Sequence, residues 1–138
     1  MDKIKAKEIR FGFSETEDGV PDANGTTFSG PDAWAQANAW LLKRSMALKD
    51  DMLGYLKHDF EITWEDGETY KGRYDLYPYG GKHDFEALDK HVRDFCLFYA
   101  GLKRPSHVSE DNYRVLVATA SKQTAYRDFL DRYEIGQE

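Results

Sequence analysis

The chain has 138 residues, of which 41% are hydrophobic, 14% aromatic and 32% charged, with a formal net charge of −6. This composition excludes a disordered protein and suits one domain with a sizeable core, so we expect a single α+β domain over residues 1–138. The acidic balance also argues against direct nucleic-acid binding, which needs clustered Lys and Arg against the phosphates.

Cysteine usage and the apolar runs indicate the compartment. The single cysteine, Cys96, excludes an intramolecular disulfide framework and favours a reducing environment. No apolar run reaches the length of a membrane span, and residues 1–10 lack the apolar core of a signal peptide. We therefore expect a cytoplasmic protein that does not associate with a membrane.

The first third of the chain predicts a strand, a loop and a helix. Residues 8–13 alternate apolar and polar side chains, which is the period of a half-buried strand. Residues 14–27 are rich in Gly, Pro, Asp, Asn and Thr and predict a loop. Residues 29–48 predict a helix with Ser29 as its N-cap and Pro31 in its first turn. The expected buried face of this helix consists of Trp34, Ala37, Leu41 and Leu48.

Residues 57–77 predict a β-hairpin that reverses at Asp66 and Gly67. A two-residue loop would place Ile62 opposite a lysine and mix core with solvent positions. A three-residue loop that begins one residue earlier, with Gly67 in a left-handed conformation, instead pairs Ile62 with Tyr70. This register puts the rings of the hairpin on one face, and we expect it for that reason.

The other face of the predicted hairpin has complementary charges. Asp59 lies opposite Arg73 and Glu61 opposite Lys71, and each such pair contributes about 0.2–1 kcal/mol. A catalytic acid and base need environments that separate their pKa values, whereas here each carboxylate faces its own cation. The pattern favours a solvated ladder of charges over an active site.

Residues 85–102 give the clearest helix prediction, because apolar residues recur at three- and four-residue spacing without interruption. Asp84 is expected to cap the start of this helix, and Gly101 and Pro105 to end it. Opposite charges four residues apart are expected to pair on its outer face. The pairs are Glu86 with Lys90 and Asp89 with Arg93.

The remaining sequence predicts one helix that starts at Ser109 and another over residues 124–136, with a kink or a break between them. The expected fold class is therefore α+β. A small antiparallel sheet, formed by the N-terminal strand and the 57–77 hairpin, packs in this prediction against three or four helices.

No residue pattern indicates a catalytic, cofactor or metal site. Cys96 lies in the apolar stripe of its helix, where an inert buried thiol is expected instead of a nucleophile. The histidines lack metal-ligand spacing, although a zinc site assembled from distant residues stays open; they are His58, His83, His91 and His107. Phosphate-binding loop and nucleophile-elbow motifs are absent.

Two surfaces are candidates for binding a protein partner. Tyr77 and Tyr79 flank a proline and precede two glycines, so they lie on a bendable connector, and tyrosine is a favoured anchor at interfaces. The alternative is that both rings fold over the core. We expect Lys71 and Arg73 of the ladder to lie beside them. The second candidate is the acidic loop 15–24, with Glu15, Glu17, Asp18 and Asp22, which would suit a basic groove on another protein.

The frame W-x-D-G-x-x-Y-x-G-R-Y-D-L, which spans residues 64–76, resembles the large polyvalent protein-associated domains, type twenty-five. Supporting segments extend the resemblance over nearly the whole chain, but only the hairpin motif is specific. The resemblance implies a protein of phages, plasmids or other mobile elements that helps the element against host defences. It carries over no catalytic residue. The matching positions are Asp66, Gly67, Tyr70, Gly72, Arg73, Tyr74 and Asp75.

The function that these observations favour is a non-enzymatic binding protein of a mobile genetic element, monomeric or weakly dimeric. It would occupy a protein surface of a host defence complex, as an anti-CRISPR or anti-restriction inhibitor does. One alternative is an accessory interaction module without an inhibitory role. A weaker alternative is a small hydrolase with a composite site, which a deep cleft holding groups with strongly shifted pKa values would indicate.

Overall fold

The computed structural model describes residues 2–16, 21–23, 25–50, 56–80, 85–100, 104, 108–119 and 123–136. The α+β class expected from the sequence is confirmed, because strands and helices are both present and the strands pair in an antiparallel sheet. The strands are β1 (Ala6–Thr16), β2 (Pro21–Ala23), β3 (Thr26–Ser29), β4 (Leu56–Trp64) and β5 (Thr69–Leu76). The helices are α1 (Ala33–Asp50), α2 (Leu88–Tyr99), α3 (Glu110–Thr119) and α4 (Gln123–Arg132).

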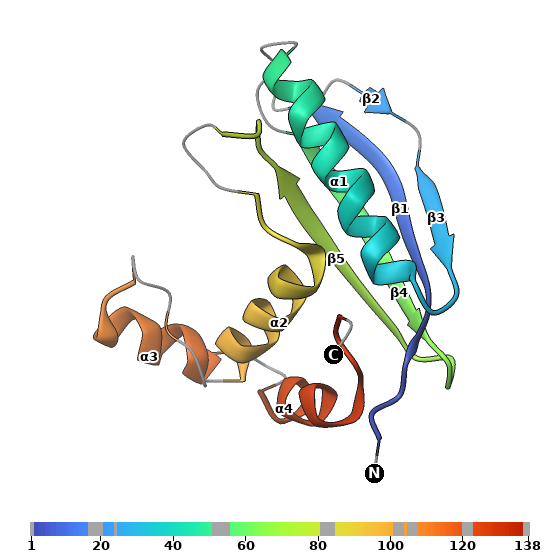
Figure 1. Cartoon of the computed structure of the whole chain (residues 1–138). Coiled ribbons are helices and arrows are strands. Elements are labelled where there is room, and N and C mark those ends of the chain that lie inside the picture. Colours follow the sequence, from blue (N-terminus) through green and yellow to red (C-terminus); the bar gives the residue numbers. More distant parts are fainter. Residues whose placement is uncertain are drawn as a thin grey trace.

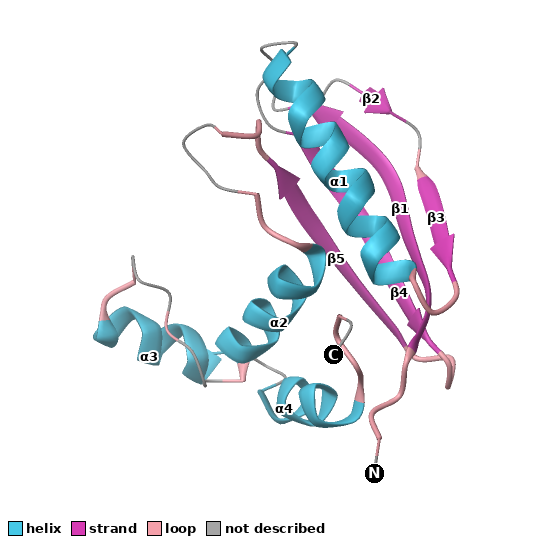
Figure 2. Ribbon diagram, in the orientation of Figure 1, coloured by secondary structure: helices cyan, strands magenta, loops and turns pink. Residues whose placement is uncertain are grey.

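The sheet has five strands, with β1 and β4 at its centre (Figures 1 and 2). The strand order is β2-β1-β4-β5, and β3 pairs with β1 along the edge that β2 also uses. The sheet is thus larger than the predicted three strands. The prediction of a loop over residues 14–27 is wrong in part, because β1 continues to Thr16 and the chain returns as two short strands.

The physical reason for these extra strands is tertiary. Phe28 of β3 packs against Trp40 of α1 and Phe11 of β1, with ring centroids 6.1 and 6.4 Å apart. Pairing also satisfies the backbone groups along the outer edge of β1. Pro21 opens β2 at the edge of the sheet, where a missing N–H is tolerated.

Helix α1 crosses one face of the sheet (Figure 1). Its predicted buried face is confirmed, since Trp34, Ala37, Leu41 and Leu48 are all buried. The predicted cap is wrong: Ser29 is the last residue of β3 and lies opposite Glu8 of β1. The chain instead turns at Gly30, which has a φ of +91°, and the helix begins at Ala33. Ser29 pairs as a strand residue, although local sequence rules assign it to the start of the helix.

The predicted hairpin register is confirmed. Ile62 lies opposite Tyr70, Glu61 opposite Lys71 and Phe60 opposite Gly72. Gly67 has a φ of +92°, which is the left-handed conformation that the three-residue loop requires. A glycine is also required at position 72, because a Cβ there would lie 2.7 Å from the Phe60 ring.

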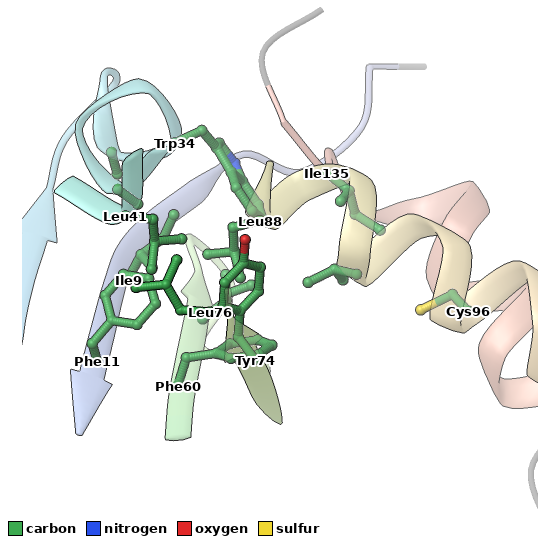
Figure 3. Close-up of a cluster of buried hydrophobic side chains, with 14 of the residues drawn as sticks. Ile9, Phe11, Trp34, Leu41, Phe60, Tyr74, Leu76, Leu88, Cys96 and Ile135 are labelled. Carbon is green, nitrogen blue, oxygen red and sulfur yellow. The ribbon is translucent and has the colours of Figure 1, made fainter. Parts of the chain in front are cut away.

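The rest of the covered face of the sheet packs against α2 and α4. Tyr70 contacts the rings of Phe95 and Phe129, at centroid distances of 6.3 and 5.7 Å, and Trp64 contacts Phe129 at 4.9 Å. Figure 3 shows how α1, the sheet and α2 contribute side chains to one core cluster, with Cys96 at the α2 end. Burial of these apolar side chains is the main source of stability.

Helix α2 follows its prediction in part. Leu88, Val92 and Cys96 are buried, but Phe95 is 36% exposed. The helix begins at Leu88, after its N-cap residue Ala87, so the prediction of a start at residue 85 is wrong. The expected cap Asp84 and the expected end at Gly101 and Pro105 lie outside the described residues. The expected stripe residues Tyr99 (its side chain) and Leu102 lie outside them too. Both predicted ion pairs form, with N–O distances of 3.5 Å for Glu86–Lys90 and 3.9 Å for Asp89–Arg93.

The start of α2 is stabilised from another helix. The Leu88 N–H donates to Oδ1 of Asn38 on α1 at 2.8 Å, and Nδ2 of Asn38 donates to Asp89 at 2.9 Å. The N-cap residue itself, Ala87, makes no side-chain capping bond. Asn38 thus satisfies one of the backbone donors that a helix start leaves open, and it fixes α2 against α1.

The last two helices are present as predicted, but α4 ends at Arg132 instead of continuing to Gly136, and Tyr133 bridges to Ile4. The Asn112 N–H donates to Oγ of Ser109 at 3.2 Å, so Ser109 caps α3 as predicted. Helices α3 and α4 are described up to Thr119 and from Gln123, so the expected kink or break between them lies outside the described residues. Gly136 follows α4 with a φ of +90°.

Candidate functional site

The face of the sheet opposite α1 is polar, and we call it the open face. Its side chains alternate along β1, β4 and β5 with those of the core, because successive residues of a strand point to opposite sides. The rings that contact α1, α2 and α4 belong to the other side. The residues of the open face are Glu8, Arg10, Gly12, Lys57, Asp59, Glu61, Thr63, Thr69, Lys71, Arg73 and Asp75.

The charges of the open face pair across three strands. Glu61 on β4 lies 3.8 Å from Arg10 on β1 and 3.4 Å from Lys71 on β5. The sequence predicts one cation for each carboxylate, whereas in the structure Glu61 pairs with two cations. The Arg10 and Lys71 side chains are 59% and 75% exposed, so each pair is worth only about 0–1 kcal/mol. This arrangement suits a solvated surface or an interface.

A shallow hollow of about 530 Å³ lies in the middle of the open face. Gly12 forms part of it, and a Cβ at that position would come 3.7 Å from the Asp59 carbonyl oxygen. The hollow is lined by Arg10, Lys71 and Arg73 and by the carboxylates of Asp59 and Glu61. It therefore presents mixed charge to a partner and has one more cation than carboxylates.

The groups with shifted pKa values have structural causes. The Tyr133 hydroxyl donates to Asp66 at 2.6 Å and holds the pKa of that carboxyl below its usual range. Burial raises the pKa of Tyr74, whose hydroxyl donates to the Glu86 carbonyl. Burial also raises the pKa of Cys96 to about 12, so this thiol is protonated and unreactive at neutral pH. Asp66 lies in the hairpin turn, Tyr74 in β5 and Cys96 in α2, so these three groups belong to different elements.

The described histidines serve the fold. His58 is buried between the rings of Phe11 and Trp40, at centroid distances of 6.0 and 5.4 Å. Nε2 of His91 on α2 lies 2.9 Å from the carbonyl oxygen of Arg73 on β5. His83 and His107 lie outside the described residues. Among the residues that the structure describes, no three His, Cys, Asp or Glu side chains are grouped as metal ligands.

The connector with Tyr77 and Tyr79 and the charged ladder with Lys71 and Arg73 do not form the one continuous surface that the sequence predicts. The Tyr79 N–H donates to the carbonyl oxygen of Ser45 on α1 at 3.0 Å, and Oγ of Ser45 donates to the Tyr77 carbonyl at 2.7 Å. These bonds hold the connector on the helical side of the sheet, while Lys71 and Arg73 point to the open face. Tyr77 is half-buried, and Tyr79 is 44% exposed.

Sequence reasoning missed an exposed apolar side chain on α1. Met46 follows Ser45 on α1 and is 50% exposed, although methionine is usually buried. Its position outside the apolar stripe of α1 is the signal that could have indicated it. Met46 and Tyr79 are thus both exposed apolar side chains outside the open face.

The acidic loop is only partly described. Glu15 lies in β1 opposite Pro21 of β2 and Lys57 of β4, and Asp22 lies in β2. The side chains of these two residues, and all of Glu17 and Asp18, lie outside the described residues. The backbone therefore brings Glu15 near β2, but the structure gives no geometry for an acidic cluster.

Comparisons with protein-family models, with curated proteins and with solved structures found no match to this chain. The resemblance of the hairpin motif thus stays an expectation. No helix within the described ranges is long and apolar enough to span a membrane.

Proposed function

We propose that this chain is a non-enzymatic binding protein of a mobile genetic element. In this proposal it acts in the host cytoplasm and inhibits a defence complex by occupying one of its protein surfaces. The mobile-element context comes from the W-x-D-G-x-x-Y-x-G-R-Y-D-L motif of β4 and β5. The binding role comes from the arrangement of the charged side chains.

The observation that supports binding most is the open face itself. It presents charged side chains from three neighbouring strands on a broad, shallow surface whose hollow is lined by five ionisable groups. Charged and polar groups arranged on a broad surface are typical of an interface rim and determine register and partner choice. A hydrolase would instead need an enclosed site with an acid and a base in contrasting environments.

A capture experiment tests this proposal. The tagged protein is used as bait in a lysate of the host, and bound proteins are identified by mass spectrometry. We expect one defence complex to be retained by the parent protein and lost with the Lys71→Glu, Arg73→Glu double variant. Lys43→Glu on α1 is the matched control, because Lys43 is exposed and lies on the helical side of the sheet. Equal capture by the parent and the double variant would exclude the open face.

Two further variants distinguish the other candidate surfaces. If Tyr79 is the anchor, Tyr79→Ala costs at least about 2 kcal/mol of binding free energy and the affinity depends little on salt. If the acidic loop 15–24 is the contact, neutralising its carboxylates weakens binding, and the parent affinity falls steeply with salt. Adding the parent protein to the purified complex then separates an inhibitor from an accessory module, because only the inhibitor lowers the activity of the complex.

A further inference from the structure

Another surface lies where residues of α2, α4, the N-terminal segment and the segment after α4 line one pocket, next to the bridge between Ile4 and Tyr133. A pocket of about 240 Å³ is present there. Its apolar walls are Leu97 of α2, Leu130 of α4, and Tyr133 and Ile135 of the segment that follows α4. The two leucines are half-buried, whereas Tyr133 and Ile135 are buried. The floor is thus apolar, with the leucines open to contact.

The rim of this pocket is cationic, although the whole chain has a net charge of −6. Lys3, Arg93 and Arg127 line the pocket, against one carboxylate, Asp131. One Arg93 nitrogen donates to the Ile135 carbonyl at 2.6 Å and lies 3.9 Å from Asp89, so this guanidinium is held in place. Within the described part of the chain, neither Lys3 nor Arg127 makes an ion pair.

The cations of this pocket differ from those of the open face in how they are paired with carboxylates. On the open face, Arg10 and Lys71 have Glu61 within 4 Å. At the pocket, Lys3 and Arg127 line an apolar depression, and neither has a carboxylate within ion-pair distance in the described chain. An anionic ligand gains from such cations because it does not have to displace an internal ion pair.

We propose that this pocket binds an acidic segment of a protein partner, with one large apolar side chain on Leu97 and Leu130 and flanking carboxylates on Lys3, Arg93 and Arg127. The volume supports an anchoring side chain, because sites for whole small-molecule ligands usually enclose about 300–1,000 Å³. An apolar anchor in a pocket with a charged rim is also the usual arrangement of an interface hot spot.

The test uses the full-length protein and a synthetic probe. The probe is a capped pentapeptide with a central leucine and two acidic residues on each side. We expect it to shift the backbone NMR signals around Leu97 and Leu130, and its affinity to fall as salt is raised. Replacing the central leucine of the probe by alanine, or its acidic residues by lysine, is expected to weaken binding about tenfold or more.

Protein variants locate the binding. Arg127→Glu and Lys3→Glu each weaken the peptide about tenfold or more, whereas Lys43→Glu on α1 leaves the affinity within about twofold. Unchanged NMR spectra of the free variants, away from the mutated residue, establish that they fold as the parent does. Equal weakening by all three variants overturns the proposal, because it shows a non-specific charge effect.

Two more outcomes also overturn it. One is the absence of any shift near Leu97 and Leu130 at about 1 mM peptide. The other is tighter binding of octanoate than of the peptide, which would assign the pocket to a small amphiphile. This inference rests on the proposed function only in taking the partner to be a protein. Peptide binding at this pocket without capture of a complex would contradict the proposed function and leave this inference standing. Capture of a complex without peptide binding would contradict this inference and leave the proposed function standing.

Discussion

The β4–β5 hairpin is held by contacts between residues close in the sequence, whereas the junction of α1 with α2 is held by contacts between residues far apart. In the hairpin, opposed residues such as Ile62 and Tyr70 are close in sequence, and Gly67 determines their register. At the junction, Asn38 bonds Leu88 and Asp89 across sequence separations of 50 and 51 residues. The hairpin can therefore be predicted from residue spacing, whereas the junction requires two helices to be placed first.

The largest effect is expected in the covered face of the hairpin. Ile62 is fully buried, so Ile62→Ala removes apolar contacts and leaves a cavity, at a cost of about 2–5 kcal/mol in the free energy of unfolding. Thr63→Ala on the open face is the matched control and should stay within about 0.5 kcal/mol. Chemical denaturation measures both. Similar losses for the two variants would mean that the hairpin faces are assigned incorrectly.

The next effect concerns the junction. Asn38→Ala leaves the Leu88 N–H and the Asp89 carboxylate without the bonds that the amide provides. We expect the free energy of unfolding to fall by about 1–3 kcal/mol, because an unsatisfied buried donor keeps its desolvation penalty. Gln36→Ala on the exposed side of α1 is the control. If both variants lose the same amount, the loss does not come from the link between the helices, since alanine itself favours the helix at either position.

A smaller effect is expected at the hairpin turn. Gly67→Val forces a β-branched residue into a φ of +92° and should cost about 1–2 kcal/mol. Gly67→Asn should cost less, because asparagine tolerates the left-handed region. Thermal unfolding of the two variants separates backbone strain from other causes. A valine variant as stable as the asparagine variant would contradict the requirement for a left-handed turn.

The smallest effect is a pH dependence at the contact between the hairpin tip and the C-terminal segment. The bond from Tyr133 lowers the pKa of Asp66 from 3.8, so the folded state favours the ionised carboxylate. Its contribution to stability is complete above pH 3.8 and is lost as the pH falls further through the lowered pKa.

Unfolding curves between about pH 2 and pH 6 measure this dependence. Asp66→Asn should flatten the acid limb of the stability profile, and Tyr133→Phe should flatten it in the same way because it removes the donor. An unchanged acid limb in both variants would show that the Asp66 contact does not contribute.

Residue spacing alone predicts the elements for which local chemistry allows only one arrangement. The register of the hairpin, the cap at Ser109 and the two ion pairs on α2 follow from spacings of a few residues. The buried stripe of α1 follows from the helical period. In the hairpin and in α1, a one-residue shift would place apolar side chains in solvent, and the pattern excludes this.

Other features depend on which segments become neighbours in the folded chain, and residue spacing does not predict them. Ser29 caps no helix because β1 pairs with it as a strand residue, and residues 21–23 become a strand because the edge of β1 is open to them. The placement of Tyr79 depends on its bond to Ser45 of α1. The gathering of Lys3, Arg93 and Arg127 around one pocket likewise requires both chain ends to meet α2. Local sequence patterns cannot encode such contacts, because their energy arises only when residues far apart in the chain pack together.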